Sequence, residues 1–184
     1  MTTAAVVLAA GEGSRFAGET HKLLAMFRGK PLWSWAVDAA VAAGLDAAYV
    51  VTGAVDLSVE APAVVVRNAA WATGQATSLA AGVAAAGAAG HDVVVIGLAD
   101  QPLIGPDAWQ AVAAATATPI AVASFGGERR PPVRLAAEVW PLLPRSGDDG
   151  ARVVMRERPD LVTAVPCTGE PVDIDTLEDL ERWS

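Results

Sequence analysis

Short apolar runs that stop at a glycine or an acidic residue constrain the fold of this chain more than any other feature. Residues 4–10 contain only Ala, Val and Leu and stop at Gly11, and residues 93–98 (VVVIGL) are followed by Ala99 and Asp100. Runs without polar alternation are typical of strands buried on both faces, as in parallel sheets covered by helices. The sequence therefore predicts an α/β fold.

Helical segments alternate with these strands along the chain. We predict strands over 4–10, 47–51, 63–66, 92–98, 120–123 and 161–165, with a short one over 132–134. We predict helices over 32–43, 77–86, 106–116, 135–143, 148–158 and 176–183. In a chain of 184 residues without an internal repeat or linker, this alternation indicates one doubly wound α/β domain over 1–184 with a mostly parallel sheet. Residues 124–132 are the strongest candidate for a flexible segment, because they contain two glycines and two prolines.

The charge balance excludes several classes of partner. There are 13 basic and 21 acidic residues, a net charge of −8, which argues against nucleic acid or an anionic membrane surface as a partner. Cys167 is the only cysteine, and the two histidines have no ligand at metal spacing, so neither a disulfide nor a structural zinc site is expected. No apolar run reaches the ~20 residues of a membrane helix. The N-terminus lacks a basic signal region, so we expect a cytoplasmic protein.

Three segments that directly follow predicted strands carry most of the polar signals. They begin at Gly11, at Asn68 and at Asp100. Open parallel sheets bind ligands beyond the carboxyl ends of their strands. We therefore expect the three segments to meet in one crevice.

The first of these segments is rich in glycine and carries two basic residues. Residues 11–18 hold three glycines, and Arg15 and Lys22 supply positive charge. Glycine lets the backbone turn with positive φ and approach a ligand closely, and successive amides in such a loop form a concavity for phosphate. The loop therefore predicts a polyphosphate site, whereas a plain surface turn with a solvated Arg15 is the simpler alternative.

Two common phosphate loops do not match this segment. The dinucleotide fingerprint needs a third glycine where Phe16 stands, and an acidic residue after the second strand, where Thr52 and Gly53 stand. The Walker loop needs Lys and then Ser or Thr after Gly18, but the chain continues with Glu19-Thr20. An NAD(P) oxidoreductase stays open from the fold alone but is disfavoured.

A third pattern does match. The sequence L-A-A-G-x-x-x-R followed by K, from Leu8 to Lys22, resembles the signature of the MobA-like NTP transferase family. Four further family motifs follow in order: N-x-x-W-x-x-G-x-x-x-S at Asn68, Trp71, Gly74 and Ser78; L-x-D-x-P around Asp100; G-D-x-G-A-R from Gly147 to Arg152; and D-I-D-T-x-E-D-L from Asp173 to Leu180. Together they resemble the molybdenum cofactor cytidylyltransferase (MocA-like) branch.

The resemblance implies a fold, an activity and a set of roles. The fold would be the Rossmann-like, nucleotide-diphospho-sugar transferase type. The activity would be Mg²⁺-dependent transfer of CMP from CTP to a phosphorylated acceptor of molybdopterin type, with a molybdoenzyme as a possible maturation partner. The implied roles are charge stabilisation by Arg15 and Lys22; nucleotide binding by Leu8, Ala9, Ala10, Gly11, Gly13, Ser14, Asn68, Gly74 and Ser78; metal binding by Asp100, Asp175 and Asp173; and acceptor binding by Gly147, Asp148, Gly150 and Arg152.

Each of these motifs also has a simpler interpretation. Asn68 could be a turn residue, Trp71 a packing residue, and Asp100 and Asp175 helix or turn caps. The branch usually carries R-G-[HN]-P near the acceptor, whereas this chain has Arg-Pro-Pro at 130–132. A guanylyl or other transferase acting on a sugar phosphate or phospho-acid therefore stays open. So does a non-catalytic nucleotide-binding regulator.

Overall fold

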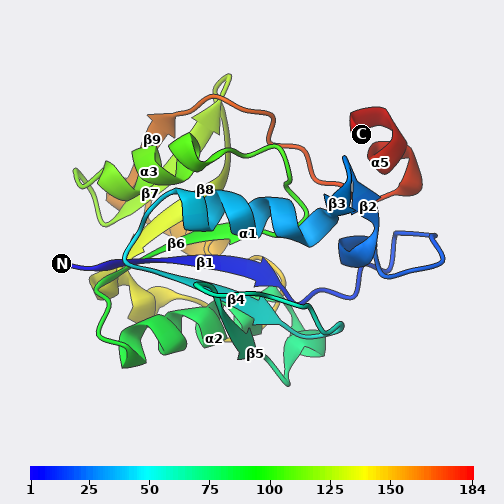
Figure 1. Cartoon of the computed structure of the whole chain (residues 1–184). Coiled ribbons are helices and arrows are strands. Elements are labelled where there is room, and N and C mark those ends of the chain that lie inside the picture. The colour runs from blue at the N-terminus through cyan, green and yellow to red at the C-terminus, as the bar shows by residue number, and fades with distance from the viewer.

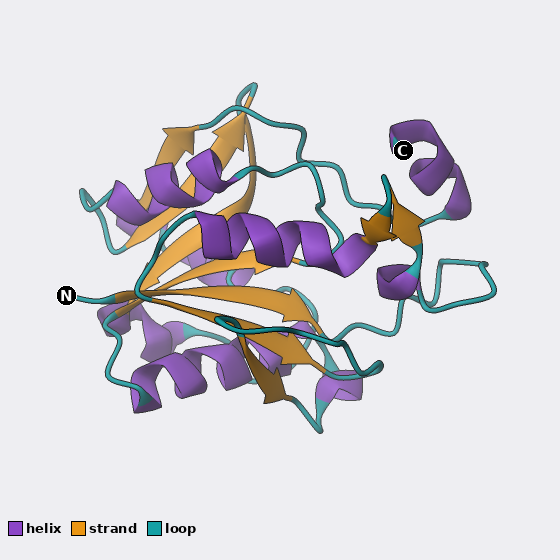
Figure 2. Ribbon diagram, in the orientation of Figure 1, coloured by secondary structure: helices purple, strands orange, loops and turns teal.

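A seven-stranded mixed sheet forms the centre of the molecule, as the computed structural model of residues 1–184 shows (Figures 1 and 2). Its strands lie in the order β5-β4-β1-β6-β8-β7-β9. Only β8 is antiparallel to its neighbours, so the predicted α/β fold with a mostly parallel sheet is confirmed. The strands are β1 (Thr3–Ala9), β4 (Ala47–Thr52), β5 (Val64–Arg67), β6 (Val93–Leu98), β7 (Ile120–Phe125), β8 (Glu128–Ala136) and β9 (Val162–Pro166).

Helices cover both faces of this sheet (Figure 2). Alternate residues of β1 enter different cores: Ala5 and Val7 pack with α1 and α3, while Val6 and Leu8 pack with α2 and α4. This two-sided burial explains why the strand is apolar at every position. The helices are α1 (Leu32–Ala42), α2 (Gln75–Ala88), α3 (Pro106–Ala114), α4 (Arg152–Glu157) and α5 (Leu177–Trp183), and β2 (Met26–Phe27) pairs with β3 (Lys30–Pro31) in a separate ribbon.

The segment before α4 differs from the sequence prediction. The expected helix over 135–143 is wrong, because β8 continues to Ala136 and only Ala137–Leu142 forms a 3-10 helix. Residues 124–132 lie mainly in the β7–β8 hairpin, whose turn at Gly126-Gly127 has positive φ at both positions. The ladder shifts register between the pairs 122–133 and 123–130. This bulge accommodates the two prolines, which cannot donate ladder hydrogen bonds.

The C-terminal helix α5 begins at a capping box. The Thr176 hydroxyl accepts a hydrogen bond from the Asp179 amide at 3.1 Å, and the Asp179 carboxylate accepts one from the Thr176 amide at 2.9 Å. The Thr176 hydroxyl also donates to the Asp179 carboxylate at 2.8 Å, and this hydrogen bond is the main cause of the lowered pKa of Asp179. The carboxylate's part of the cap therefore weakens as the pH falls and Asp179 becomes protonated. The cap fixes the segment that immediately precedes it, which contains Asp173 and Asp175.

Thr176→Ala is therefore expected to lower the free energy of unfolding by about 1 kcal/mol, the usual effect of removing an N-cap hydroxyl. Urea denaturation at neutral pH measures this difference. Thr20→Ala is the matched control, because the Thr20 side chain is exposed in the glycine-rich loop. Equal stability of the two variants would contradict the capping role.

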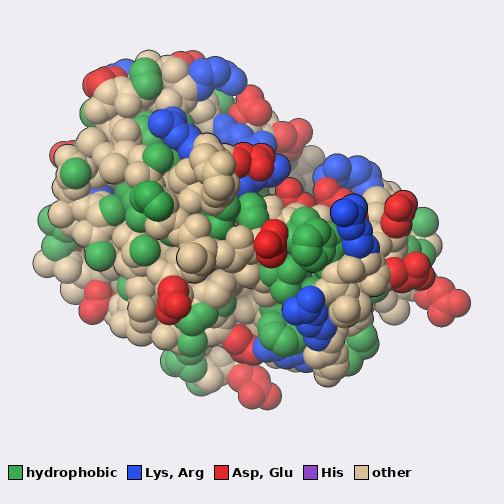
Figure 3. All heavy atoms as spheres, turned by 90° about the horizontal axis from the view of Figure 1, so that it is seen from above, with side chains coloured by type: hydrophobic (Ala, Val, Ile, Leu, Met, Phe, Trp, Pro, Cys, Tyr) green, Lys and Arg blue, Asp and Glu red, His purple; other side chains and the backbone are tan.

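The surface has no single sign of charge on the face seen in Figure 3, where Lys and Arg side chains lie among Asp and Glu side chains. No helix in the structure combines the length and apolar character needed to cross a membrane.

Candidate active site

Two adjoining cavities lie at the carboxyl ends of β1 and β6, and the glycine-rich loop borders both. The smaller, about 210 Å³, contains Lys22, Asp100 and Asp175; the larger, about 470 Å³, extends toward Trp71 and Gly74. The expected convergence of the three loop segments is therefore present. The predicted residues lining one or both cavities are Leu8, Ala9, Ala10, Gly11, Gly13, Ser14, Arg15, Lys22, Gly74, Ser78, Asp100, Asp148 and Asp175.

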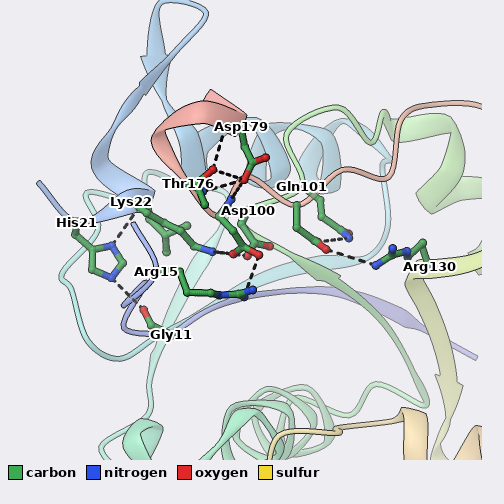
Figure 4. Close-up of polar contacts among 12 residues, drawn as sticks. Gly11, Arg15, His21, Lys22, Asp100, Gln101, Arg130, Thr176 and Asp179 are labelled. Carbon is green, nitrogen blue, oxygen red and sulfur yellow. Dashed lines mark hydrogen bonds and ion pairs between the residues drawn. The ribbon is translucent and has the colours of Figure 1, made fainter. Parts of the chain in front are cut away.

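Lys22 lines the smaller cavity, and Figure 4 shows its side chain reaching Asp100. Its ammonium donates to Asp100 Oδ2 at 2.8 Å and to Asp175 Oδ1 at 2.6 Å, and its side chain is only 11% exposed. Burial alone would lower the pKa of Lys22, but the charges and hydrogen bonds of Asp100 and Asp175 outweigh it and raise the pKa. Lys22 is therefore a fixed positive charge at neutral pH.

Arg15 adds a second, more mobile positive charge to this cluster. Its guanidinium lies 2.9 Å from Asp175 Oδ2, yet its side chain is 75% exposed. An exposed ion pair contributes little to stability, so the arginine can leave Asp175 for a more strongly charged ligand at small cost. Asp175 itself is held by the capped start of α5, where its amide donates to Asp179 Oδ2 at 3.1 Å.

His21 connects the glycine-rich loop to the turn that carries Lys22. Its Nδ1 accepts a hydrogen bond from the Leu23 amide at 3.2 Å, and its Nε2 lies 3.0 Å from the Gly11 carbonyl oxygen. Because Nδ1 is the acceptor, Nε2 carries the proton and donates to Gly11. His21 has no role in the sequence motifs, but its side chain links the glycine-rich loop to the turn that carries Lys22.

Asn68, for which the motif suggested a nucleotide-binding role, lines neither of the two cavities. Its side chain is buried, its Nδ2 donates to Thr77 Oγ1 at 2.9 Å and Ser78 Oγ at 3.0 Å, and its Oδ1 accepts from the Ala70 amide. All its polar atoms are thus used inside the protein. Asn68 instead fixes the first turn of α2, which carries Ser78.

The segment from Gly147 to Arg152 is divided between two cavities. Gly147 packs against the start of α2, where its carbonyl accepts from the Ala76 amide at 2.9 Å, and Asp148 lines the larger of the two cavities described above. Gly74 has φ +114°, and a Cβ there would lie 2.5 Å from the Gly147 oxygen, so only glycine fits. Gly150 and Arg152 line a third cavity.

This third cavity combines an apolar floor with four arginines. Its volume is about 290 Å³, and it lies beside the larger of the two cavities described above, sharing Leu8 and Gln75 with it. The lining arginines are Arg129 and Arg130 from β8 and Arg152 and Arg156 from α4. The cavity suits a flat or apolar molecule that carries anionic groups.

Asp173 lies apart from the Lys22 cluster. Its Oδ1 accepts from Gln101 Nε2 at 2.8 Å, and its Oδ2 lies 3.4 Å from the Arg130 guanidinium (Figure 4). Burial raises the pKa of Asp173, and the negative charge of Asp100 raises it further. Asp173 forms no ion pair with Lys22 or Arg15, so in this structure it does not join Asp100 and Asp175 in the Lys22 cluster.

Asp100 and Asp175 fit a divalent cation of the Mg²⁺ type. Such cations take oxygen ligands and use one or two carboxylates together with substrate phosphates and water. No group of three or more acidic, His or Cys side chains forms a complete protein site, so phosphate and water would supply the remaining ligands. Lys22 lies between the two carboxylates, and a bound cation therefore requires Lys22 to release at least one of them.

Four residues of this region carry no assigned role in the sequence motifs. Gln101 is buried and holds Asp173. Trp71 lines the larger cavity and packs over Gly53, while Arg129 and Arg130 line the arginine-rich cavity. The tryptophan of the N-x-x-W motif could have identified Trp71 as a residue of the site from the sequence. The partners of Gln101 and Arg130 are distant in sequence, so no local spacing identifies them.

The fold and the site define a nucleotidyltransferase. Residues 5–162 match the MobA-like NTP transferase domain family, and the chain belongs to this family. It is 31% identical over 194 residues to nicotine blue oxidoreductase from Paenarthrobacter nicotinovorans, covering 96% of this chain and 94% of that protein. Membership of this family implies that the substrates of this chain are an NTP and a phosphorylated acceptor.

Solved structures agree with this assignment. A nucleotidyl transferase from Methanothermobacter superposes with a TM-score of 0.80 at 25% identity over 98% of this chain and 95% of that one. Rv0371c from Mycobacterium tuberculosis, solved with manganese, has a TM-score of 0.78 at 25% identity over 100% and 98%. Nucleotidyltransferases of this kind generally use a divalent metal.

Proposed function

We propose that the protein transfers CMP from CTP to a phosphorylated acceptor of molybdopterin type, with Mg²⁺, and releases pyrophosphate in the cytoplasm. The observation that carries this proposal is the Lys22 ammonium held between Asp100 and Asp175, at the edge of a glycine-rich loop. A buried cation and a pair of carboxylates can together hold a triphosphate and the metal that accompanies it. A molybdoenzyme that receives the product is the corresponding protein partner.

The reaction is an in-line displacement. An oxygen of the acceptor phosphate attacks the α-phosphorus of CTP, the bond from the α-phosphorus to the bridging oxygen breaks, and pyrophosphate leaves with the electron pair. The protein contributes position and charge rather than a covalent intermediate. Lys22 and Arg15 neutralise the charge that develops on the leaving pyrophosphate. When bound by Asp100 and Asp175, Mg²⁺ would supply additional positive charge at the phosphates.

The acceptor would occupy the arginine-rich cavity. Its apolar floor matches a fused ring, and its arginines match anionic groups on that ring, as molybdopterin carries them. The cavity shares Leu8 with both cavities of the nucleotide side. An acceptor phosphate can therefore reach the nucleotide without leaving the crevice.

The base would lie in the larger cavity near Trp71. Ser78 and Asp148 line the same cavity and offer hydrogen-bond acceptors, which suit the exocyclic amino group of cytosine. Ala10, directly after β1, also lines this cavity. These acceptors favour a base with an exocyclic amino group over uracil, and the resemblance to the cytidylyltransferase branch favours CTP among such donors.

Thermal unfolding with individual nucleotides tests the donor. With CTP at about 100 times its dissociation constant and Mg²⁺, the free energy of unfolding is expected to rise by about 2.7 kcal/mol. The comparison includes GTP, ATP and UTP, each with and without Mg²⁺. It also includes NADH, because one relative is named an oxidoreductase. If GTP with Mg²⁺ raised the free energy of unfolding more than CTP does, GTP would be the donor. If only NADH raised it, the proposal would be contradicted.

A further inference from the structure

The segment Asp173-Ile174-Asp175 sends its two carboxylates to different parts of the crevice. Ile174 is fully buried, and its amide donates to the Asp100 carbonyl at 2.9 Å. This contact anchors the segment on the turn that follows β6. Asp175 contacts Lys22 and Arg15 on the nucleotide side. Asp173 instead contacts Gln101 and Arg130, the second of which belongs to β8, and Figure 4 labels these two partners.

Arg130 is the one arginine of the third cavity that carboxylates hold in place. Its Nη2 lies 2.8 Å from Glu128 Oε1, and its Nη1 lies 3.4 Å from Asp173 Oδ2. The other lining arginines, Arg129, Arg152 and Arg156, form no ion pair in the structure. An arginine side chain loses considerable rotamer freedom when it binds a ligand, and a side chain fixed beforehand avoids that loss.

The Asp173 carboxylate is itself fixed by a buried residue. Gln101 is 2% exposed and donates to Asp173 Oδ1 at 2.8 Å. The chain of contacts therefore runs from a buried amide through a carboxylate to a guanidinium that lines the acceptor cavity. Asp173 forms no ion pair with Lys22 or Arg15, the two cations that Asp175 contacts.

We propose that Asp173 is a positioning residue, which orients the Arg130 guanidinium to bind an anionic group of the acceptor and does not bind the metal. This inference rests on the proposed function, since it assigns the third cavity to the acceptor. It divides the closing motif between the two substrates: Asp175 serves the nucleotide and its metal, and Asp173 serves the acceptor.

Steady-state transfer kinetics with molybdopterin and CTP varied separately test this division. For Asp173→Asn, the KM for molybdopterin is expected to rise about tenfold, the usual scale for a lost hydrogen bond between charged groups. The KM for CTP is expected to change less than twofold. The affinity for Mn²⁺ in the presence of CTP, measured by electron paramagnetic resonance, is expected to match the unchanged protein. Retained Mn²⁺ and CTP binding also shows that the variant folds.

A double-mutant cycle with Arg130→Ala separates positioning from a general structural effect. If Asp173 acts through Arg130, Asp173→Asn adds nothing to the KM for molybdopterin in the Arg130→Ala background. Asp173→Glu is expected to restore part of the loss, and Glu170→Gln, in the same C-terminal segment and exposed, is the control without effect.

Two results would overturn the inference. A loss of Mn²⁺ affinity in Asp173→Asn equal to that in Asp175→Asn would identify Asp173 as a metal ligand. Additive effects in the cycle would show that Asp173 does not act through Arg130. An unchanged protein that transfers CMP to no acceptor would instead remove the proposed function, and the inference with it.

Discussion

Replacing Lys22 by alanine is expected to lower the turnover number at least ~100-fold, the scale for loss of one charge-stabilising donor. The Lys22 ammonium is the buried positive charge of the site, 2.8 Å from Asp100 and 2.6 Å from Asp175. Without it, the leaving pyrophosphate loses its fixed counter-charge, Asp100 loses its ion-pair partner, and Asp175 keeps only the exposed Arg15. Pyrophosphate release at saturating CTP and acceptor measures the effect.

Lys30 provides a matched control, because it is the only other lysine in the chain. It pairs with Asp38 and stacks over Trp35, away from the residues that line the crevice. Lys30→Ala is expected to retain turnover within twofold. If Lys22→Ala also turned over like the unchanged protein, Lys22 would have no part in stabilising the charge of the reaction.

Replacing Asp100 by asparagine is expected to lower turnover and Mn²⁺ affinity at least ~100-fold each. Mutating a residue that only hydrogen-bonds to a metal ligand typically lowers metal affinity or activity 10–100-fold. Mutating a direct ligand is expected to lower them at least as much. Asp100 uses only Oδ2 to accept from Lys22, so its other oxygen is available to a cation. Titration of Mn²⁺ by electron paramagnetic resonance with CTP present gives the affinity.

Asp107→Asn is the control for this variant. Asp107 is an exposed residue in the first turn of α3, so its loss removes one negative charge without touching the crevice. Both Mn²⁺ affinity and turnover are expected to stay within twofold. Mn²⁺ binding by Asp100→Asn as tight as that of the unchanged protein would show that the carboxylate serves only to hold Lys22.

The parallel part of the fold could be predicted because burial on both faces leaves a continuous apolar run, as in β1 and β6. The antiparallel part could not. Residues 135–143 are apolar except for Glu138 and have no clear period, and such a run does not distinguish a strand from a helix. The prolines of β8 also argue against a strand unless a bulge accommodates them, and a bulge depends on the partner strand.

The residues of the candidate site divide in the same way. Lys22, Asp100 and Asp175 come after β1, β6 and β9, respectively. The topology places the carboxyl ends of these three strands at the same edge of the sheet, and there the three side chains meet. Asn68 and Asp173 are the residue types that the motifs require at these positions. Their side chains nevertheless form hydrogen bonds with Ser78 and Gln101, respectively, inside the protein. Which neighbour a side chain selects depends on tertiary contacts that motif spacing does not encode.

Transfer of label from CTP carrying radioactive phosphorus at the α-position tests the central claim most directly. With molybdopterin and Mg²⁺, we expect the label to move to the acceptor, with one pyrophosphate released for each transfer and no transfer without the metal. Parallel reactions with a sugar phosphate and with GTP as donor establish the specificity. Label that stays in CTP with every acceptor, although CTP binds, would contradict the account and indicate a protein that binds the nucleotide without transferring it.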